Sequence, residues 1–262
     1  MRNLIHATSR RLGFSPLGWL RNTWRMRTWV RSLGPAHEPA ASGIRIGVVL
    51  TPWLDTAVPW FTLAVGLLLA RQGNRVHFLV DDSPFGDSPV RYRFVLRCLR
   101  FVLARVPGSL KSQLLSTQRA PAPLDAAGHR AIVRLARLNA TWALRGEMLV
   151  AGRATYTQSC AAQMADADPP IASLVKPGAF DLLFIPGGVY GISGLWARQA
   201  RAAGIRIGSF DSGGYGTVML ACNGIACQLQ DIPAAFNVLK ARCAADPGEL
   251  RFALDTALAE MA

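Results

Sequence analysis

The sequence has little lysine, no paired cysteines and no long apolar run. Only three of its 29 basic residues are lysines, so arginine supplies nearly all of the positive charge. The five cysteines form no CxxC pair, and an odd number gives no complete disulfide framework, which favours a reducing, cytoplasmic compartment. The longest apolar stretch, 57–70, has 14 residues. A helix needs about 20 residues to span a bilayer, so no membrane-spanning helix is predicted.

Several chemical motifs are also missing. Neither the GxGxxG nor the GxxxxGK[ST] spacing of nucleotide-binding loops occurs, and no cofactor is predicted. The GxSxG turn of many serine hydrolases is absent, which argues against a Ser-His-Asp triad. No zinc-finger spacing or basic zipper accompanies the arginines. Nucleic acid is therefore not an expected partner, and no metal site is predicted.

What is present is a globular composition with an uneven positive charge. The chain is 51% hydrophobic and carries a net charge of +13. Residues 1–42 contribute +6 and residues 91–153 contribute +10, whereas 43–90 and 154–262 are close to neutral. This distribution suits a basic face presented to a membrane surface or a phosphorylated ligand. The alternative is that the arginines lie on solvated faces of helices that pack against a sheet.

The first basic segment predicts a helix over 16–33, because Pro16 follows a capping Ser15 and Gly34-Pro35 ends the pattern. One side of this helix is apolar and the other is rich in arginine, as in helices that lie at a membrane interface. The residues expected to contact a membrane are Trp19, Arg21, Arg25, Trp29 and Arg31. Trp24 departs from this pattern, since it falls among the arginines. The alternative is a surface helix that packs its apolar stripe on the domain.

Beyond a linker that ends at residue 42, the sequence predicts a single Rossmann-like α/β domain over 43–262. Apolar strands are expected at 44–50, 75–80, 180–185 and 205–210, with helices such as 59–72 and 195–203 between them. This alternation indicates a mainly parallel sheet with helices on both faces. Two basic amphipathic helices, 91–106 and 125–149, are expected to form a helical insertion at about 91–153.

Three loops, 51–56, 186–194 and 211–216, follow the carboxyl ends of predicted strands, where open parallel sheets bind ligands. Asp211 is the candidate general base and Asp55 a second candidate; the alternative for each is an aspartate that caps its own turn. The glycine-rich turn at 186–194 offers backbone N–H groups at a helix start, or is only a tight turn. The candidate substrate-binding residues are Trp53, Gly187, Gly188, Tyr190, Ser212, Gly213 and Asp231.

Four segments together resemble the N-terminal half of bacterial capsular or surface polysaccharide biosynthesis proteins of the glycosyltransferase B type. They are GIRIGVVLTPWLDTAVPWF at 43–61, DDSPF at 81–85, FDLLFIPGGVYGISGL at 180–195 and GSFDSGGYGTVMLACNGIACQLQDIPAAF at 208–236. In such enzymes two Rossmann-like domains face each other across a cleft. The resemblance implies that this chain is the acceptor domain and that Asp211 deprotonates the acceptor hydroxyl.

The resemblance and the distribution of positive charge together set the expected partners and location. These are a sugar or lipid-linked acceptor, an anionic membrane surface, and a separate chain carrying the donor domain, because no second α/β pattern follows in this sequence. A cytoplasmic, peripheral place on the inner face of the cell membrane is expected. The alternatives are a non-catalytic membrane-associated scaffold and a truncated gene product. The segments FDLLFIPGG and IRIGSFDSGGYG also resemble class I amidotransferase-like enzymes, but the turn that would hold their nucleophilic cysteine has Asp211 and Ser212.

Overall fold

The fold is described from a computed structural model. It describes residues 16–34, 40, 43–53, 56–83, 89–106, 110–118, 124–144, 152–212, 217–228, 232–246, 248, 251–252, 255–256 and 258–259. Three residues for which the sequence predicts a role at the site, Asp55, Gly213 and Asp231, lie outside the described residues.

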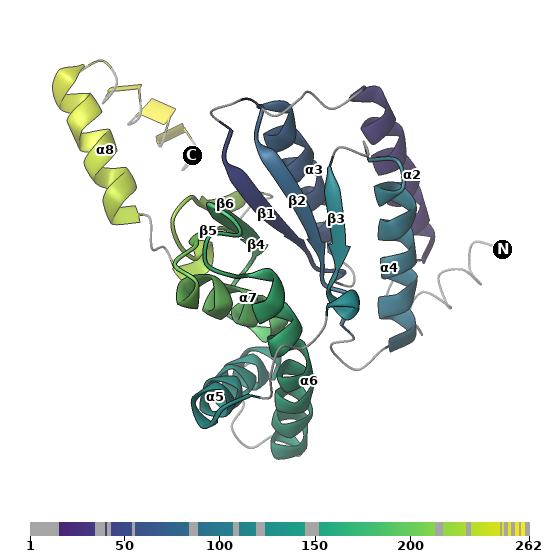
Figure 1. The fold of residues 1–262 in the computed structure, drawn as a ribbon. Coiled ribbons are helices and arrows are strands. Elements are labelled where there is room, and N and C mark those ends of the chain that lie inside the picture. Colours follow the sequence, from purple (N-terminus) through teal and green to yellow (C-terminus); the bar gives the residue numbers. More distant parts are fainter. Residues whose placement is uncertain are drawn as a thin grey trace.

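A six-stranded sheet in the order β3-β2-β1-β4-β5-β6 forms the centre of the molecule (Figure 1). The strands are β1 (Arg45–Leu50), β2 (Arg75–Val80), β3 (Lys111–Leu114), β4 (Leu182–Pro186), β5 (Arg206–Ser212) and β6 (Val218–Ala221). The first five are parallel, and β6 pairs antiparallel with β5. The predicted mainly parallel, Rossmann-like α/β fold is thereby confirmed.

Helices cover both faces of the sheet and produce two cores. On one face, α2 (Pro16–Ser32), α3 (Val58–Arg71) and α4 (Pro89–Leu103) pack over strand residues such as Val48 and Phe78. On the other face, α5 (Ala126–Ala143), α6 (Arg153–Leu174) and α7 (Gly191–Ala202) pack over Val49 and Leu79. Neighbouring residues of a strand point to opposite faces, so apolar residues at consecutive positions are needed when both faces are buried.

Close packing of α3 on the sheet requires a residue without a side chain. A Cβ atom at Gly66 would come within 2.5 Å of the Phe78 ring and 3.3 Å of Val48. The absence of that atom lets α3 approach the strands directly. Its first turn lies at the carboxyl edge of the sheet, because α3 is the element that directly follows β1 in the chain.

Helix α2 packs on the domain, which corrects the expected membrane contact of Trp19. Trp19 is 5% exposed and its ring centroid lies 5.4 Å from that of Trp60 in α3. Val30 is also buried, and Trp29 is half-buried against the same core. The apolar stripe therefore faces the protein, because Trp60 and the neighbouring helices offer an apolar surface that covers it. Arg21, Arg25 and Arg31 remain exposed.

The segment 91–153 contains a strand of the sheet as well as helices, whereas the sequence predicts only helices there. Helix α4 is the crossover between β2 and β3, and β3 extends the sheet at its edge. The sequence did not predict β3, whose four residues, KSQL, are largely polar. Helix α6, with 22 residues, was also not predicted; its buried Asp168 accepts hydrogen bonds from Arg198 and Gln199 at 2.8 and 2.9 Å and so ties α6 to α7.

At the other edge, α8 (Ile232–Ala245) lies away from the sheet in Figure 1. Among the described parts of the chain, no helix combines the length and the hydropathy needed to cross a membrane.

Candidate functional site

A cavity of about 320 Å³ opens at the carboxyl edge of the sheet. It lies beside the ends of β1 and β4, the point at which successive strands change their direction of travel across the sheet. Such switch points are where open α/β sheets bind ligands. The lining residues are Thr51, Pro52, Trp53, Thr56, Asp81, Ser83, Tyr92, Asn139, Trp142, Gly187, Tyr190, Gly191, Ile192, Ser193 and Asp211.

The predicted site residues Trp53, Gly187, Tyr190 and Asp211 all line this cavity, although they are far apart in the sequence. Asp211 lies in β5, where it pairs with Met219 of β6, and not in a loop as the sequence predicts. The structure thus brings these residues together, and their chemical roles stay predictions. Ser212 is the last residue of β5 and pairs with Val218.

The glycine-rich turn has a conformation that its glycines permit. Gly187 and Gly188 have φ angles of +67° and +109°, in the region that other residues rarely adopt. A Cβ atom at Gly188 would also lie 2.5 Å from Ile225. Gly188 donates its N–H to the Ser193 hydroxyl at 3.3 Å, and that hydroxyl donates to the Tyr190 carbonyl at 2.7 Å. These contacts bring the first turn of α7 against the cavity, so the positive end of its helix dipole lies at the cavity wall.

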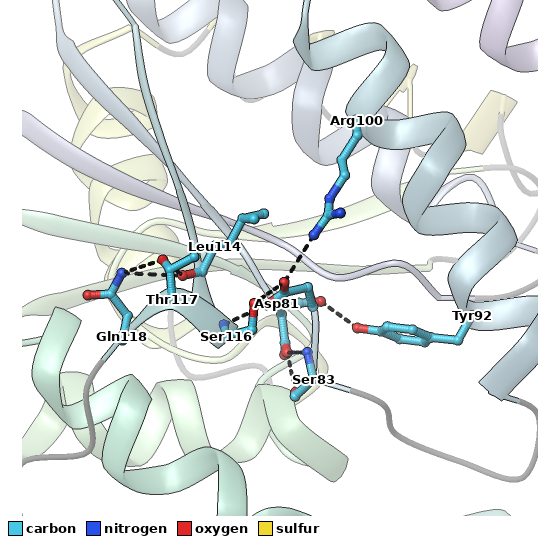
Figure 2. A network of polar contacts seen from close by, with 9 residues as sticks. Asp81, Ser83, Tyr92, Arg100, Leu114, Ser116, Thr117 and Gln118 are labelled. Atoms are coloured by element: carbon cyan, nitrogen blue, oxygen red, sulfur yellow. Dashed lines mark hydrogen bonds and ion pairs between the residues drawn. The ribbon is translucent and has the colours of Figure 1, made fainter.

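Asp81, directly after β2, is the buried carboxylate of the cavity. Its Oδ1 accepts the Ser83 hydroxyl at 2.5 Å, and its Oδ2 accepts the Trp196 Nε1–H at 3.2 Å. The Tyr92 hydroxyl donates a hydrogen bond to the backbone carbonyl of Asp81, as Figure 2 shows. Burial raises the pKa of Asp81 from 3.8 to about 6, partly offset by the Ser83 and Trp196 hydrogen bonds.

The neighbouring Asp82 holds the surrounding elements together. It accepts the backbone N–H and hydroxyl of Ser116 at 2.7 and 2.5 Å, and it pairs with Arg100 of α4 at 3.2 Å. These contacts link the end of β2 to the turn after β3 and to α4 (Figure 2). Asp82 is therefore a positioning residue for the loop that carries Asp81.

Thr51 places a buried hydroxyl group beside the cavity. Its side chain is 4% exposed, and its Oγ1 has no hydrogen-bond partner among the described residues. A buried hydroxyl without a partner destabilises a fold by about 1–3 kcal/mol. Its position at the cavity fits a role in binding a ligand, which would supply the missing bond.

Aromatic side chains form the walls of the cavity. The rings of Trp142 and Tyr190 stack with centroids 5.4 Å apart and planes 24° apart. The Trp53 ring passes close to the backbone of Gly187, where an added Cβ would lie 3.3 Å from it. Asp211, near the end of β5, is half-buried on the same cavity. Burial and then the Asp211 carboxylate raise the pKa of the Cys227 thiol.

Sequence reasoning missed Thr51, Asp81, Ser83, Tyr92, Asn139 and Trp142. Asp81 could have been found, since it follows an apolar strand just as Asp211 does. The positions of Asn139 and Trp142 depend on how α5 docks against α6 and α7, which no local pattern encodes. Among the described residues, no group of three or more His, Cys, Asp or Glu side chains could hold a metal ion.

The turn that would hold the nucleophile of the amidotransferase-like alternative begins at Asp211 and Ser212, which are the last residues of β5 and pair antiparallel with Met219 and Val218 of β6. Comparison with known proteins gave no further assignment: no protein-family model matches the chain, and no curated protein matches it significantly.

Proposed function

We propose that the cavity binds one sugar unit of an acceptor, and that the chain is the acceptor domain of a glycosyltransferase that acts in surface polysaccharide synthesis. One observation carries the proposal: aromatic rings, two carboxylates and an unpartnered buried hydroxyl line the same cavity. A sugar offers both apolar C–H faces and hydroxyl groups, so it suits such a mixed lining. The volume is near the lower end of the 300–1,000 Å³ that is common for small-molecule sites, roughly enough for a single ring with its substituents.

Asp211 is the proposed general base of the transfer. It would accept the proton of an acceptor hydroxyl while that oxygen attacks the anomeric carbon of a nucleotide-sugar, whose nucleoside diphosphate leaves. Asp81 is less suited to this role, because it is 1% exposed and already accepts hydrogen bonds from Ser83 and Trp196. Asp81 instead positions the Ser83 hydroxyl on the cavity wall. The nucleotide-sugar itself would be bound by a separate donor domain.

The proposal includes a cytoplasmic, peripheral location at the inner face of the cell membrane, where a lipid-linked acceptor is held. The concentration of arginine in two segments supports it, since anionic headgroups attract such segments. A non-catalytic scaffold would share this location but would not need the cavity to bind a sugar.

The test is sugar binding to the full chain, measured by saturation-transfer NMR. The probes are methyl glycosides of neutral hexoses, N-acetylhexosamines and hexuronic acids. We expect at least one class to bind, and Trp53→Ala to weaken that binding at least about tenfold, because a ring buried against a ligand contributes more than about 1.4 kcal/mol.

Trp24→Ala is the matched control, since Trp24 is exposed on α2 and does not line the cavity. This variant should bind the sugar as the unaltered chain does. If no glycoside binds, or if both tryptophan variants weaken binding equally, the proposed acceptor site is wrong.

A further inference from the structure

Helix α2 has a second apolar stripe on the side opposite its buried residues. Leu17, Leu20 and Trp24 are 53%, 42% and 58% exposed. Their spacing of three and four residues places them on one helix face. Trp19 and Val30 are buried on the other side. Packing on the domain has thus used one stripe and left the stripe around Trp24 at the surface.

The exposed stripe continues onto α4. Phe101 is 43% exposed, and its ring meets that of Trp24 edge-on, with centroids 6.1 Å apart. The Arg27 guanidinium lies over both rings, 4.0 Å from the Phe101 centroid and 5.4 Å from that of Trp24. Figure 1 shows α2 and α4 side by side. We call the surface formed by Leu17, Leu20, Trp24 and Phe101, with the exposed Arg21, Arg25, Arg31 and Arg97, the α2–α4 face.

The charge of this face has a single sign. Helices α2 and α4 contain eight arginines and neither aspartate nor glutamate. The arginines on the face flank the apolar residues, since Arg21 and Arg25 follow Leu17 by one turn and two turns. Apolar side chains with a central tryptophan and flanking cations are typical of segments that lie in a lipid headgroup region.

We infer that the α2–α4 face binds the surface of an anionic lipid bilayer, with Leu17, Leu20 and Trp24 entering the interface and the arginines contacting headgroup phosphates. The inference rests on the proposed peripheral location and is independent of the chemistry proposed for the cavity. It differs from the contact expected from the sequence, which used Trp19 and Trp29 on the side that the domain covers.

Helix α5 supplies a matched control surface. Its Arg130 and Arg134 are also exposed and four residues apart, but its exposed Trp142 stacks on Tyr190 at the cavity. The double variants Arg21→Glu/Arg25→Glu and Arg130→Glu/Arg134→Glu lower the net charge of the chain equally. Only the first changes the α2–α4 face.

The experiment is sedimentation of the full chain with vesicles of phosphatidylcholine, with and without phosphatidylglycerol. We expect binding to the phosphatidylglycerol vesicles only. The Arg21→Glu/Arg25→Glu variant should weaken it by at least about tenfold, since each arginine near an anionic surface contributes roughly a factor of five in affinity. The α5 variant should stay within about twofold of the unaltered chain.

A second pair of variants tests the apolar part. Trp24→Ser should weaken vesicle binding, whereas Phe236→Ser on α8, where the phenylalanine is 63% exposed, should not. With brominated acyl chains in the vesicles, tryptophan emission should be quenched, and Trp24→Phe should remove most of that quenching. Equal melting temperatures and sugar binding would show that the variants are folded.

Each result of these experiments either supports or contradicts membrane binding by the α2–α4 face. If the unaltered chain does not bind anionic vesicles, both the peripheral location and the face are wrong, while the cavity proposal is untouched. If the two double variants weaken binding equally, or if only the α5 variant does, the chain binds through total charge or through α5, and the α2–α4 face is wrong.

Discussion

The carboxylates at the two ends of the sheet have pKa values that are shifted in opposite directions. At the amino end, Asp181 before β4 accepts the Arg45 backbone N–H at 2.7 Å and pairs with its guanidinium at 2.9 Å. The bonds from Arg45 hold the pKa of Asp181 at about 2. At the carboxyl end, burial raises the pKa of Asp81 to about 6. At the amino end, the carboxylate is thus paired with an arginine. At the carboxyl end, burial disfavours the charged form of Asp81, and the nearby Thr51 hydroxyl has no hydrogen-bond partner among the described residues. Both features are expected where a ligand completes the contacts.

The largest expected effect is on the pH dependence of stability through Asp81. Its folded pKa lies above the ordinary value, so ionisation disfavours the folded state. The stability that it contributes at low pH is therefore lost as pH rises from 3.8 to about 6, and stays lost above that. This loss is on the order of 3 kcal/mol.

Asp81→Asn should abolish that pH dependence, which urea denaturation between these pH values would measure. Asp166→Asn, at an exposed position of α6, is the control and should keep the dependence of the unaltered chain. An Asp81→Asn variant that still lost stability over this range would show that the two ends of the sheet do not differ in this way.

A smaller effect is expected from the two buried threonines at Thr51 and Thr62. Thr51→Val should raise the free energy of unfolding by about 1 kcal/mol, because it removes a buried hydroxyl without a partner. Thr62 is equally buried, but its hydroxyl donates to the Val58 carbonyl at 2.8 Å. Thr62→Val should therefore not stabilise the chain. Thermal unfolding of both variants tests the contrast, and a loss of stability in Thr51→Val would contradict it.

The smallest effect is expected at the amino end. Asp181 has a lowered pKa, so its contribution is present above the ordinary pKa and is lost as pH falls from 3.8 to about 2. The side chains of Arg45 and Asp181 are 43% and 38% exposed, and solvent and salt weaken such a pair.

Asp181→Asn should remove a small loss of stability in that acidic range, with a sign opposite to that of Asp81→Asn. The melting temperature at low and high salt measures it. A loss of stability that salt does not reduce would show that the Asp181 hydrogen bonds, rather than its charge, account for the effect.

Sequence patterns predicted the strands that form the middle of the sheet, because consecutive apolar residues such as Val48 and Val49 identify strands that are buried on both faces. The edge strand β3 has no such pattern, since only part of it faces a core. Site residues could be predicted where they lie at the carboxyl end of a predicted strand, as Trp53 and Asp211 do, because open parallel sheets bind ligands there. The same rule applied to β2 would have added Asp81.

The side of α2 that packs on the domain could not be decided in the same way. The stripe with Trp19 and Trp29 suits an interface with either lipid or protein, because both offer an apolar environment. The choice depends on Trp60 in α3, which is 41 positions from Trp19 in the sequence and meets it only in the folded chain. Trp24 departed from the expected pattern for the corresponding reason: it belongs to the other face.

The hydrogen bond between Asp81 and Trp196 has a consequence for folding kinetics. It joins residues 115 positions apart, one after β2 and the other in α7. Contacts of such separation require a large loop to close, and they form late in folding. The strands β1 and β2 can pair through a short local crossover, whereas the cavity needs β4 and α7 to dock on them first. During refolding we therefore expect the emission of the buried Trp196 to reach its native value only in the slowest phase, together with the ability to bind a ligand.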